Sequence, residues 1–392
     1  MIATLGSPLP ADRGARIRDL ELVRRLASRH EVILAPIVPA NELASLRGLH
    51  AEVARVLPIA SAASMARVPC RLPLLARGLP AACLPYLGWG VRRVFARMVE
   101  EVHPASVQVE HSFLSPLVDE IDAGSCRRVL SLHNVASGQY ASIARATRGA
   151  QRGLVELKQR LATGLERRYL PRFEAVVVVS RPERDAVLRL DPGAEVTVIE
   201  NGVDTSRLQP LPRPSRRSVL FVANLEYGPN QAAVRWLCDE IVPALRQLSP
   251  RAEVRVVGTG GSRRLRRLAA QAEVQMVGGV SDLLPHYGRA SVCVAPLRAG
   301  GGSRVKILEA MALGRPVVST PLGAAGLELE PDRHILLAAD AGGFARQISR
   351  AFADQELWGR VSAEARARAE ARYDWDMLGA RLGQLHERLA GS

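Results

Sequence analysis

The sequence predicts an α/β protein made of two doubly wound domains, and three observations indicate this fold class. Short apolar strands alternate with amphipathic helices along most of the chain, which is the pattern of parallel sheets covered by helices. The 392 residues exceed one ordinary hydrophobic core and fit two domains of about 150 to 200 residues each. The alternation stops at residues 205–217, where three prolines indicate a segment leading out of a hinge. We therefore expect domains at 1–203 and 204–372, followed by a terminal helix at 373–392.

The composition is that of an ordinary soluble globular protein, with 47% hydrophobic and 23% charged residues. The five cysteines are scattered and form no Cys-x-x-Cys pair, so neither a disulfide framework nor a zinc site is indicated. A reducing cytoplasm is therefore the expected location. The chain begins with a strand pattern instead of the layout of a signal peptide. No apolar run approaches the roughly 18 residues that a membrane span requires.

The formal net charge of +14 fits nucleic acid, an anionic membrane surface or acidic small substrates as partners. Aromatic residues make up only 4% of the chain and do not alternate with the arginines, so we expect no nucleic acid partner. The arginine cluster at residues 263–268 is typical of the solvated face of a helix. Residues 71–97 mix leucines and aromatic residues with arginines. They fit either an interfacial segment, in peripheral contact with the inner face of an anionic membrane, or an ordinary packed helical region.

The first domain opens with a strand at residues 1–5, a turn rich in glycine and proline at 6–14, a helix at 17–28 and a strand at 32–37. This order is the start of a doubly wound sheet. Further apolar runs predict strands at residues 106–109, 129–132, 175–180 and 196–200. Ser180 is expected to precede a helix.

Polar residues follow two of these strands. Glu110 and His111 come after the strand at 106–109, and His133 comes after the strand at 129–132. The carboxyl ends of parallel strands are where α/β sheets collect ligands, so we expect His133 at a functional site and the other two residues as acceptor contacts. A lone histidine is more often structural, and that alternative stays open.

The second domain repeats the alternation. Strands are expected at 218–223, 253–257, 274–277, 291–295 and 317–320, and helices at 231–248, 344–352, 357–372 and 377–389. The loops between these elements are rich in glycine and asparagine. A second parallel sheet follows from this order.

The most informative stretch is residues 299–320, which reads AGGGSRVKILEAMALGRPVVST. Its three glycines lead to Ser303, which we predict to cap a helix at 304–313. A glycine-rich turn before a helix is a ready anion site, because free N–H groups and the helix dipole both point at the bound charge.

Two cations lie in the first turn of this expected helix, Arg304 and Lys306. Cations gain nothing from the dipole there, so a bound anion explains them better than helix stability does. Glu309, one turn after Lys306, could accept hydrogen bonds from sugar hydroxyls. The structural alternative is a buried helix with a surface pair between Lys306 and Glu309.

The run RVKILEAMALGRPVVST at residues 304–320, together with VIENGVD at 198–204, resembles the donor-binding half of bacterial group 1, family 4 glycosyltransferases. The resemblance implies the GT-B fold, with two Rossmann-like domains facing across a cleft and a C-terminal helix crossing back to the first domain. It also implies a transferase that moves a hexosyl-type sugar from a nucleotide-sugar to a hydroxyl acceptor with retention. The acceptor would be a glycan, a lipid-linked glycan or a small molecule, as in polysaccharide biosynthesis.

The resemblance also implies roles for individual residues. His133 lies in a segment that resembles the family's "HN-V" segment and would face the sugar, with Arg304 and Lys306 as the other catalytic residues. Donor contacts would come from residues in the loops and from one carboxylate: Gly14, Asn224, Gly258, Val277, Gly278, Gly300, Gly301, Gly302, Ser303 and Glu309. The base would lie near Val277, and Glu309 would hold the ribose.

The chain departs from the family at two points. Gly301 stands where the first of two glutamates is usual, and the loop at 224–230 lacks the usual cations. We infer that Arg304 and Lys306 compensate the diphosphate charge, and we expect no metal and no cofactor besides the nucleotide-sugar. A GT-B sugar-nucleotide epimerase and a catalytically silent GT-B binding module remain alternatives.

Overall fold

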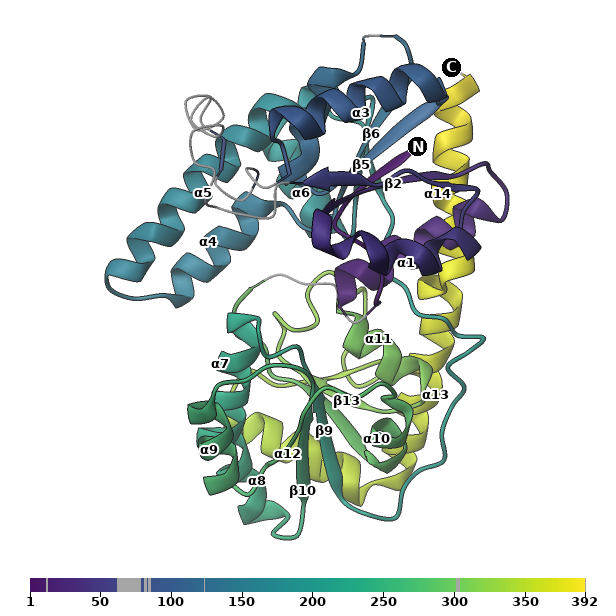
Figure 1. Cartoon of the computed structure of the whole chain (residues 1–392). Coiled ribbons are helices and arrows are strands. Elements are labelled where there is room, and N and C mark those ends of the chain that lie inside the picture. Colours follow the sequence, from purple (N-terminus) through teal and green to yellow (C-terminus); the bar gives the residue numbers. More distant parts are fainter. Residues whose placement is uncertain are drawn as a thin grey trace. The chain divides into compact units, whose positions relative to one another are not determined.

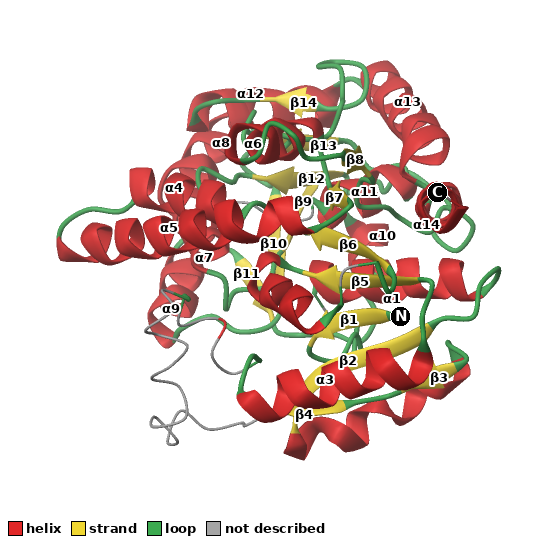
Figure 2. Ribbon diagram, turned by 90° about the horizontal axis from the view of Figure 1, so that it is seen from above, coloured by secondary structure: helices red, strands yellow, loops and turns green. Residues whose placement is uncertain are grey.

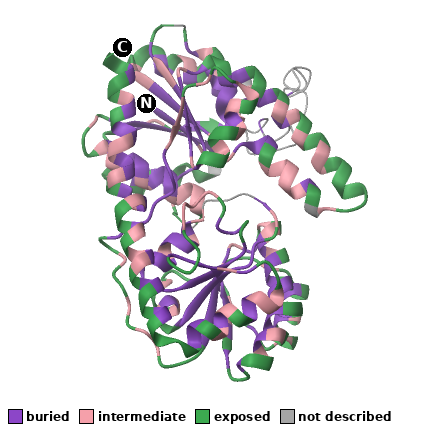
Figure 3. Cartoon of the chain, turned by 180° about the vertical axis from the view of Figure 1, so that it is seen from behind, coloured by how far each residue is buried: buried purple, intermediate pink, exposed green. Residues whose placement is uncertain are grey.

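The computed structural model describes residues 1–391 except 12, 62–78, 81–82, 84–85, 123 and 301–303. It divides into two compact units (Figure 1). Unit 1 comprises Met1–Asn201 and Trp375–Ser392, and unit 2 comprises Gly202–Gly300 and Arg304–Asp374. Each unit contains a parallel sheet flanked by helices, so the predicted fold class is confirmed. In both sheets the central strands are buried and the outer helix faces are exposed (Figure 3).

The sheet of unit 1 has eight strands, and all of its pairings are parallel. The strand order is β3-β2-β1-β5-β6-β7-β8, with β4 also paired to β2. The strands are β1 (Ile2–Leu5), β2 (Ile33–Pro39), β3 (Arg55–Val56), β4 (Ile59–Ser61), β5 (Ser106–Glu110), β6 (Arg127–Leu132), β7 (Ala175–Val178) and β8 (Val196–Val198). The order reverses between β1 and β5, and such a switch point is where open α/β sheets bind ligands.

Helices cover the unit 1 sheet (Figure 2). Two clusters of buried apolar side chains lie between the helices and the sheet. The helices are α1 (Gly14–Ala27), η1 (Ala40–Ala51), α3 (Trp89–Val102), η4 (Ser112–Glu120), α4 (Ala136–Ala146), α5 (Ala150–Tyr169), η5 (Leu170–Arg172), α6 (Arg181–Leu190) and α14 (Trp375–Gly391). Ser180 caps α6 as predicted, because its side chain accepts from the N–H of Glu183. The C-terminal helix α14 packs on α1, where Gly379 allows close approach to Arg25.

The sheet of unit 2 has six parallel strands in the order β11-β10-β9-β12-β13-β14. The strands are β9 (Ser218–Val222), β10 (Glu253–Val257), β11 (Gln275–Val277), β12 (Val292–Ala295), β13 (Val317–Ser319) and β14 (Leu336–Leu337). The helices are α7 (Gly228–Trp236), η6 (Leu237–Ile241), α8 (Val242–Leu248), α9 (Arg263–Gln271), α10 (Leu284–Arg289), α11 (Val305–Ala312), α12 (Ala341–Ala353) and α13 (Gln355–Tyr373). The helix expected at 231–248 begins three residues earlier, because Pro229 suits a first turn.

The stretch at 71–97 is in part a packed helix. Residues 71–78, 81–82 and 84–85 lie outside the described residues, but Leu87 and Phe95 are fully buried in the unit 1 core. Arg92 of α3 pairs with Glu120 at 2.5 Å. The described residues Leu87 and Phe95 therefore follow the packed alternative, and membrane contact of the stretch stays a prediction. In the described part of the chain, no helix combines the length and the apolar character needed to cross a bilayer.

Candidate functional site

Two glycines shape the loops at the carboxyl end of the unit 2 sheet. Gly258 follows β10 with a φ of +151°, and a Cβ there would lie 1.9 Å from the carbonyl oxygen of Ala223. Gly300 follows β12 with a φ of +87°, and a Cβ there would lie 2.5 Å from the hydroxyl of Tyr227. Both positions therefore need glycine for close packing as well as for conformation. Gly301, Gly302 and Ser303 lie outside the described residues.

Arg304 precedes α11 and does not lie in its first turn, so the predicted helix start was one residue too early. Its φ of +54° is left-handed, a conformation that costs an L residue roughly 1–2 kcal/mol. The side chain donates from Nη2 to the carbonyl of Leu322 at 2.8 Å. A strained residue at the mouth of a glycine-rich loop is typical of functional sites.

Lys306 lies in the first turn of α11 and is half-buried. Its Nζ donates to Oδ1 of Asn230 at 3.2 Å and lies 4.8 Å from the ring centroid of Phe221. Among the described residues it forms no ion pair. Burial, followed by the charge of Arg304, lowers the pKa of Lys306 to about 7. An anion beside Nζ would restore its charge.

The structural alternative required an ion pair between Glu309 and Lys306, and these two side chains do not form one. Its Oε2 accepts from the hydroxyl of Tyr287 at 3.0 Å, and Tyr287 is buried on α10. Burial raises the pKa of Glu309 to about 7, although Tyr287 and Lys306 oppose the shift. Lys306 and Tyr287 also line a small pocket with Val222 and Ala295, which has room for about one water molecule.

The other predicted donor residues take different positions. Asn224 organises its own loop, because its side chain accepts from the N–H of Glu226 and its carbonyl accepts from Asn230. Val277 ends β11, and Gly278 has open space where a side chain would be. Gly14 is the first residue of α1 in unit 1. The donor contacts assigned to these residues stay predictions.

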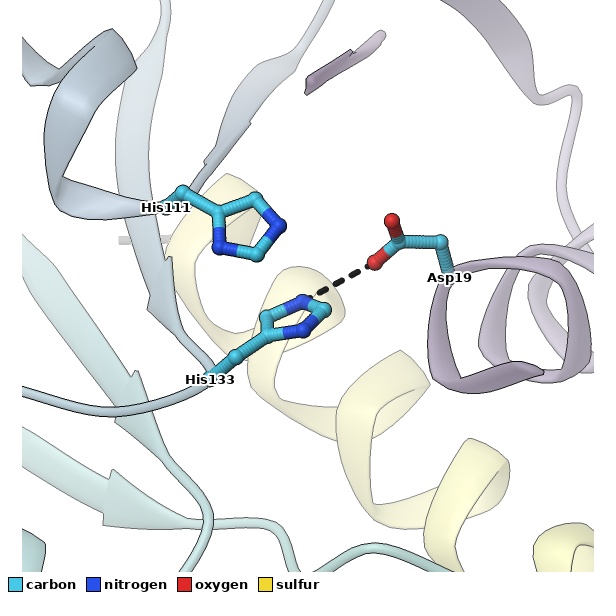
Figure 4. Close-up of side chains that lie close together, drawn as sticks. All are labelled: Asp19, His111 and His133. Carbon is cyan, nitrogen blue, oxygen red and sulfur yellow. Dashed lines mark ion pairs between the residues drawn. The ribbon is translucent and has the colours of Figure 1, made fainter. Parts of the chain in front are cut away.

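A second group of residues converges in unit 1, beside the switch point of the sheet (Figure 4). His133 follows β6, and its Nε2 lies 2.9 Å from Oδ1 of Asp19 on α1 and 3.1 Å from Oε2 of Glu110 at the end of β5. The ring of His111 stacks on that of His133 with centroids 4.0 Å apart. The structure thus brings the predicted residues Glu110, His111 and His133 together, and adds Asp19.

The ionisable groups of this cluster shift one another's pKa. Burial raises the pKa of Asp19, although the charge of His133 opposes the shift. Burial opposes an imidazolium, but Asp19 and Glu110 outweigh it and raise the pKa of His133 to about 9. Burial likewise opposes a carboxylate at Glu110, yet His133 and Arg18 lower the pKa of Glu110 to about 2. Arg18 is fully buried and donates to the carbonyl of Glu200 at 2.7 Å. Burial, followed by the charge of His133, lowers the pKa of His111 to about 3, so that ring is neutral.

Three of these side chains are of the types that bind metal ions. Asp19, His111 and His133 bring ligand-type atoms within 4.8 Å of one another. However, Nε2 of His133 hydrogen-bonds Oε2 of Glu110 and forms an ion pair with Oδ1 of Asp19, and a protonated ring has no lone pair to offer a metal. Arg18 adds a further positive charge nearby. The arrangement is therefore an ion-pair cluster.

One Asp-x-Asp sequence, a pattern that can hold a metal-bound diphosphate, occurs at residues 374–376. Asp374 accepts from the N–H and the hydroxyl of Thr205, whereas Asp376 pairs with Arg25 at 2.9 Å. Trp375 between them is buried. The two carboxylates serve different structural partners, and the expected metal independence stays a prediction.

Two further carboxylates hold the turn after His133. Glu183 accepts from the N–H of Val135 at 2.7 Å, and Glu166 accepts from the N–H groups of Ala136 and Ser137. The free donors at the start of α4 are thus satisfied within unit 1. Burial raises the pKa of Glu166 to about 7.

Sequence reasoning missed Arg18, Asp19, Asn230 and Tyr287. Asp19 carried a usable signal, because it lies four residues before buried Val23 and so shares the apolar face of its helix. Arg18 carried the same signal, because it lies four residues before buried Leu22. No comparable signal marked Asn230 and Tyr287, whose roles depend on contacts between elements distant in sequence.

The family matches cover most of the chain. Residues 14–207 match the family described as Glycosyltransferase Family 4, and residues 216–354 match Glycosyl transferases group 1. A phosphatidyl-myo-inositol mannosyltransferase of Mycolicibacterium smegmatis is 28% identical over 219 residues, which are 51% of this chain and 54% of the relative. A glycogen synthase of Mycobacterium tuberculosis is 26% identical over 229 residues, 54% of each chain. The chain thus spans about half the length of these curated relatives.

Two solved structures share the fold along the whole chain. The sucrose-phosphate synthase of Thermosynechococcus elongatus has a TM-score of 0.75 and 19% identity, covering 100% of this chain and 99% of its own. The HepE protein of Anabaena, solved in complex with UDP-glucose, has a TM-score of 0.70 and 18% identity, covering 99% of both chains. With these folds and the two family matches, the chain belongs to the group 1, family 4 glycosyltransferases with the GT-B fold.

Proposed function

We propose that this protein transfers a sugar from a nucleotide-sugar to a hydroxyl acceptor. The observation that carries the proposal is Lys306, which is half-buried, forms no ion pair among the described residues and lies beside glycine-dependent loops at the carboxyl end of the unit 2 sheet. Family membership supports the reaction class. The binding of UDP-glucose by HepE, which has a similar fold, supports a nucleotide-sugar donor.

In this proposal unit 2 binds the nucleotide. Lys306 and Arg304 contact the diphosphate, and Glu309, held by Tyr287, accepts hydrogen bonds from the ribose. Cleavage of the bond between sugar and phosphate leaves negative charge on the diphosphate, which the two preorganised cations stabilise. They replace a metal in this role, so the reaction proceeds without one. His133 of unit 1 donates a hydrogen bond to the sugar, and the configuration at the anomeric carbon is retained.

The test combines binding and turnover. A thermal-shift panel of UDP, GDP, ADP and TDP should identify one nucleotide, since a ligand at 100 times its Kd stabilises the protein by about 2.7 kcal/mol. Transfer from the matching nucleotide-sugar should persist in EDTA, and NMR of the fresh product should show a retained linkage. No stabilisation by any nucleotide would refute the proposal. Isomerised donor without transfer would identify an epimerase, and binding without turnover would identify a silent module.

For the acceptor we propose a lipid-linked sugar or lipid at an anionic membrane, reached through the α4–α5 hairpin. This hairpin extends away from the unit 1 sheet (Figure 1). Leu154 and Leu157 of α5 are 56% and 51% exposed, and they share a helix face with Lys158 because of their spacing. Exposed Arg148 and Arg160 add positive charge. A basic, apolar face of this kind suits anionic lipid, and the lipid named in the mannosyltransferase relatives supports the choice.

Co-sedimentation with liposomes tests the hairpin. The protein should bind vesicles that contain anionic lipid and should bind neutral vesicles less. The double variant Leu154→Ser, Leu157→Ser should weaken this binding. The matched control is Leu248→Ser on α8, whose leucine is 52% exposed in unit 2. Equal binding by both variants, or equal partition to neutral vesicles, would refute the assignment.

A further inference from the structure

A chain of hydrogen bonds runs from the C-terminal helix α14 to His133 inside unit 1. His386 of α14 lies between two residues of β5, with Nδ1 2.9 Å from the hydroxyl of Ser106 and Nε2 2.8 Å from Oε1 of Gln108. Gln108 in turn donates from Nε2 to Oε1 of Glu110. The other carboxylate oxygen of Glu110 lies 3.1 Å from Nε2 of His133.

The chemistry of these groups fixes the direction of the bonds that lead to Glu110. A carboxylate only accepts, so the amide group of Gln108 that faces Glu110 is its NH₂. The amide oxygen therefore faces His386, whose Nε2 must carry a proton and donate. The hydroxyl of Ser106 can donate to Nδ1 of a neutral ring or accept from Nδ1 of a charged one. In either form His386 is a donor to Gln108.

The pattern of β5 is unusual for a buried strand. Val107 and Val109 face one apolar cluster, whereas Ser106, Gln108 and Glu110 alternate onto the face that α14 covers. Gln108 and Glu110 are only 1% and 3% exposed. Apolar residues would pack this face without the cost of burying polar groups. A fully bonded polar line in this place indicates a role beyond packing.

We propose that Gln108 and His386 are positioning residues for the transfer reaction. They fix the carboxylate of Glu110 so that its second oxygen meets His133 and keeps that ring charged and oriented. The inference rests on the proposed function, because His133 acts on the sugar there. It also makes the C-terminal helix a part of the catalytic unit.

Other charged groups also face these two histidines. Asp19 and Arg18 on α1, together with His111 and Glu110, surround His133. The amino-terminal ammonium group and His30 lie near His386, and together with burial they lower the pKa of His386 to about 4. The lowered pKa favours the neutral ring, in which Nδ1 accepts from the hydroxyl of Ser106.

The test compares two replacements of His386 in the full chain. His386→Gln keeps an N–H donor at the place of Nε2, whereas His386→Phe keeps ring volume without a donor. We expect His386→Phe to lower kcat about 10-fold, with the KM for the nucleotide-sugar changed less than about twofold, since one hydrogen bond to a charged group is lost. The pKa of His133, followed by ¹⁵N NMR and assigned with His133→Asn, should fall by about one unit. His386→Gln should restore both values.

Gln108→Leu breaks the next link and should reproduce the effect of His386→Phe, so the test does not depend on one variant folding. Arg388→Ala is the control, because Arg388 of α14 pairs with Glu195 outside the chain of hydrogen bonds. Equal losses in His386→Phe and His386→Gln, or an unchanged pKa of His133 in both chain-breaking variants, would overturn the inference. If the wild type transferred no sugar, the proposed function would fail, while the NMR comparison would still decide whether His386 controls His133.

Discussion

The two candidate sites differ in how their charges are satisfied. In unit 1, His133 lies between Asp19 and Glu110, and each charge has a partner within the protein. In unit 2, Nζ of the half-buried Lys306 donates to the amide oxygen of Asn230, lies over the ring of Phe221 and forms no ion pair with a described residue, and burial lowers its pKa to about 7. The imidazole of the first site is thus paired by carboxylates of the protein itself. In the second site, a bound anion beside Nζ would favour the charged form of Lys306.

The largest effect is expected from removing His133, the centre of the unit 1 cluster. His133→Asn removes the imidazolium and should lower kcat for sugar transfer roughly 100-fold or more, the usual loss when one preorganised donor is removed. His103→Asn is the control, because His103 is exposed and has a left-handed φ of +49° that asparagine tolerates. A His133→Asn variant within about threefold of wild type would show that the cluster is purely structural.

Removing both cations of the unit 2 site should weaken the binding of the nucleotide. The double variant Arg304→Ala, Lys306→Ala should weaken nucleoside diphosphate binding tenfold or more, since charge-assisted contacts contribute about 1.5–3 kcal/mol each. Calorimetric titration measures the affinity. Lys158→Ala, which replaces the only other lysine, should leave the affinity unchanged. Unchanged affinity in the double variant would remove the assignment of the diphosphate to unit 2.

The two sites should also respond differently to pH. A bound diphosphate favours the protonated form of Lys306, so nucleotide affinity should fall as pH rises above about 7, by up to tenfold per unit. The phosphate itself is fully ionised in this range. His133, with a pKa of about 9, should stay charged over most of it. Titrations between pH 7 and 9 with wild type and Lys306→Met check this, and an equal slope in both proteins would contradict it.

The smallest effect concerns the loop of unit 2. Gly300→Ala places a Cβ against Tyr227 at a positive φ and should lower the free energy of unfolding by about 1 kcal/mol or more. Gly359→Ala, on α13 with open space at its Cβ, should be neutral or stabilising. Urea unfolding of both variants decides the point, and equal stabilities would mean that the loop adapts.

Local patterns in the sequence were enough to predict most of the fold. The apolar runs of β5, β6 and β10 and the cap at Ser180 follow from periodicity and capping chemistry, which depend on neighbours in the chain. The helix start at Val305 could not be predicted, because it depends on the left-handed backbone of Arg304.

The site residues that could be predicted are those marked by their neighbours in the chain. His133 and Glu110 could be found because they follow strands, and Lys306 because it follows glycines. Their partners could not, since Asp19, Tyr287 and His386 reach these sites from helices distant in sequence. Residues 71–97 show the limit of composition. Their basic and apolar residues fitted either an interfacial segment or a packed helix, and only tertiary packing places Leu87 and Phe95 in the core.

The central claim is that unit 2 holds a diphosphate through Lys306. A crystal structure with the nucleoside diphosphate identified by thermal shift tests it most directly. We predict a phosphate oxygen within hydrogen-bond distance of Nζ of Lys306, in place of its present contact with Asn230. A nucleotide bound elsewhere, or Lys306 still bonded to Asn230 beside an occupied site, would contradict the claim.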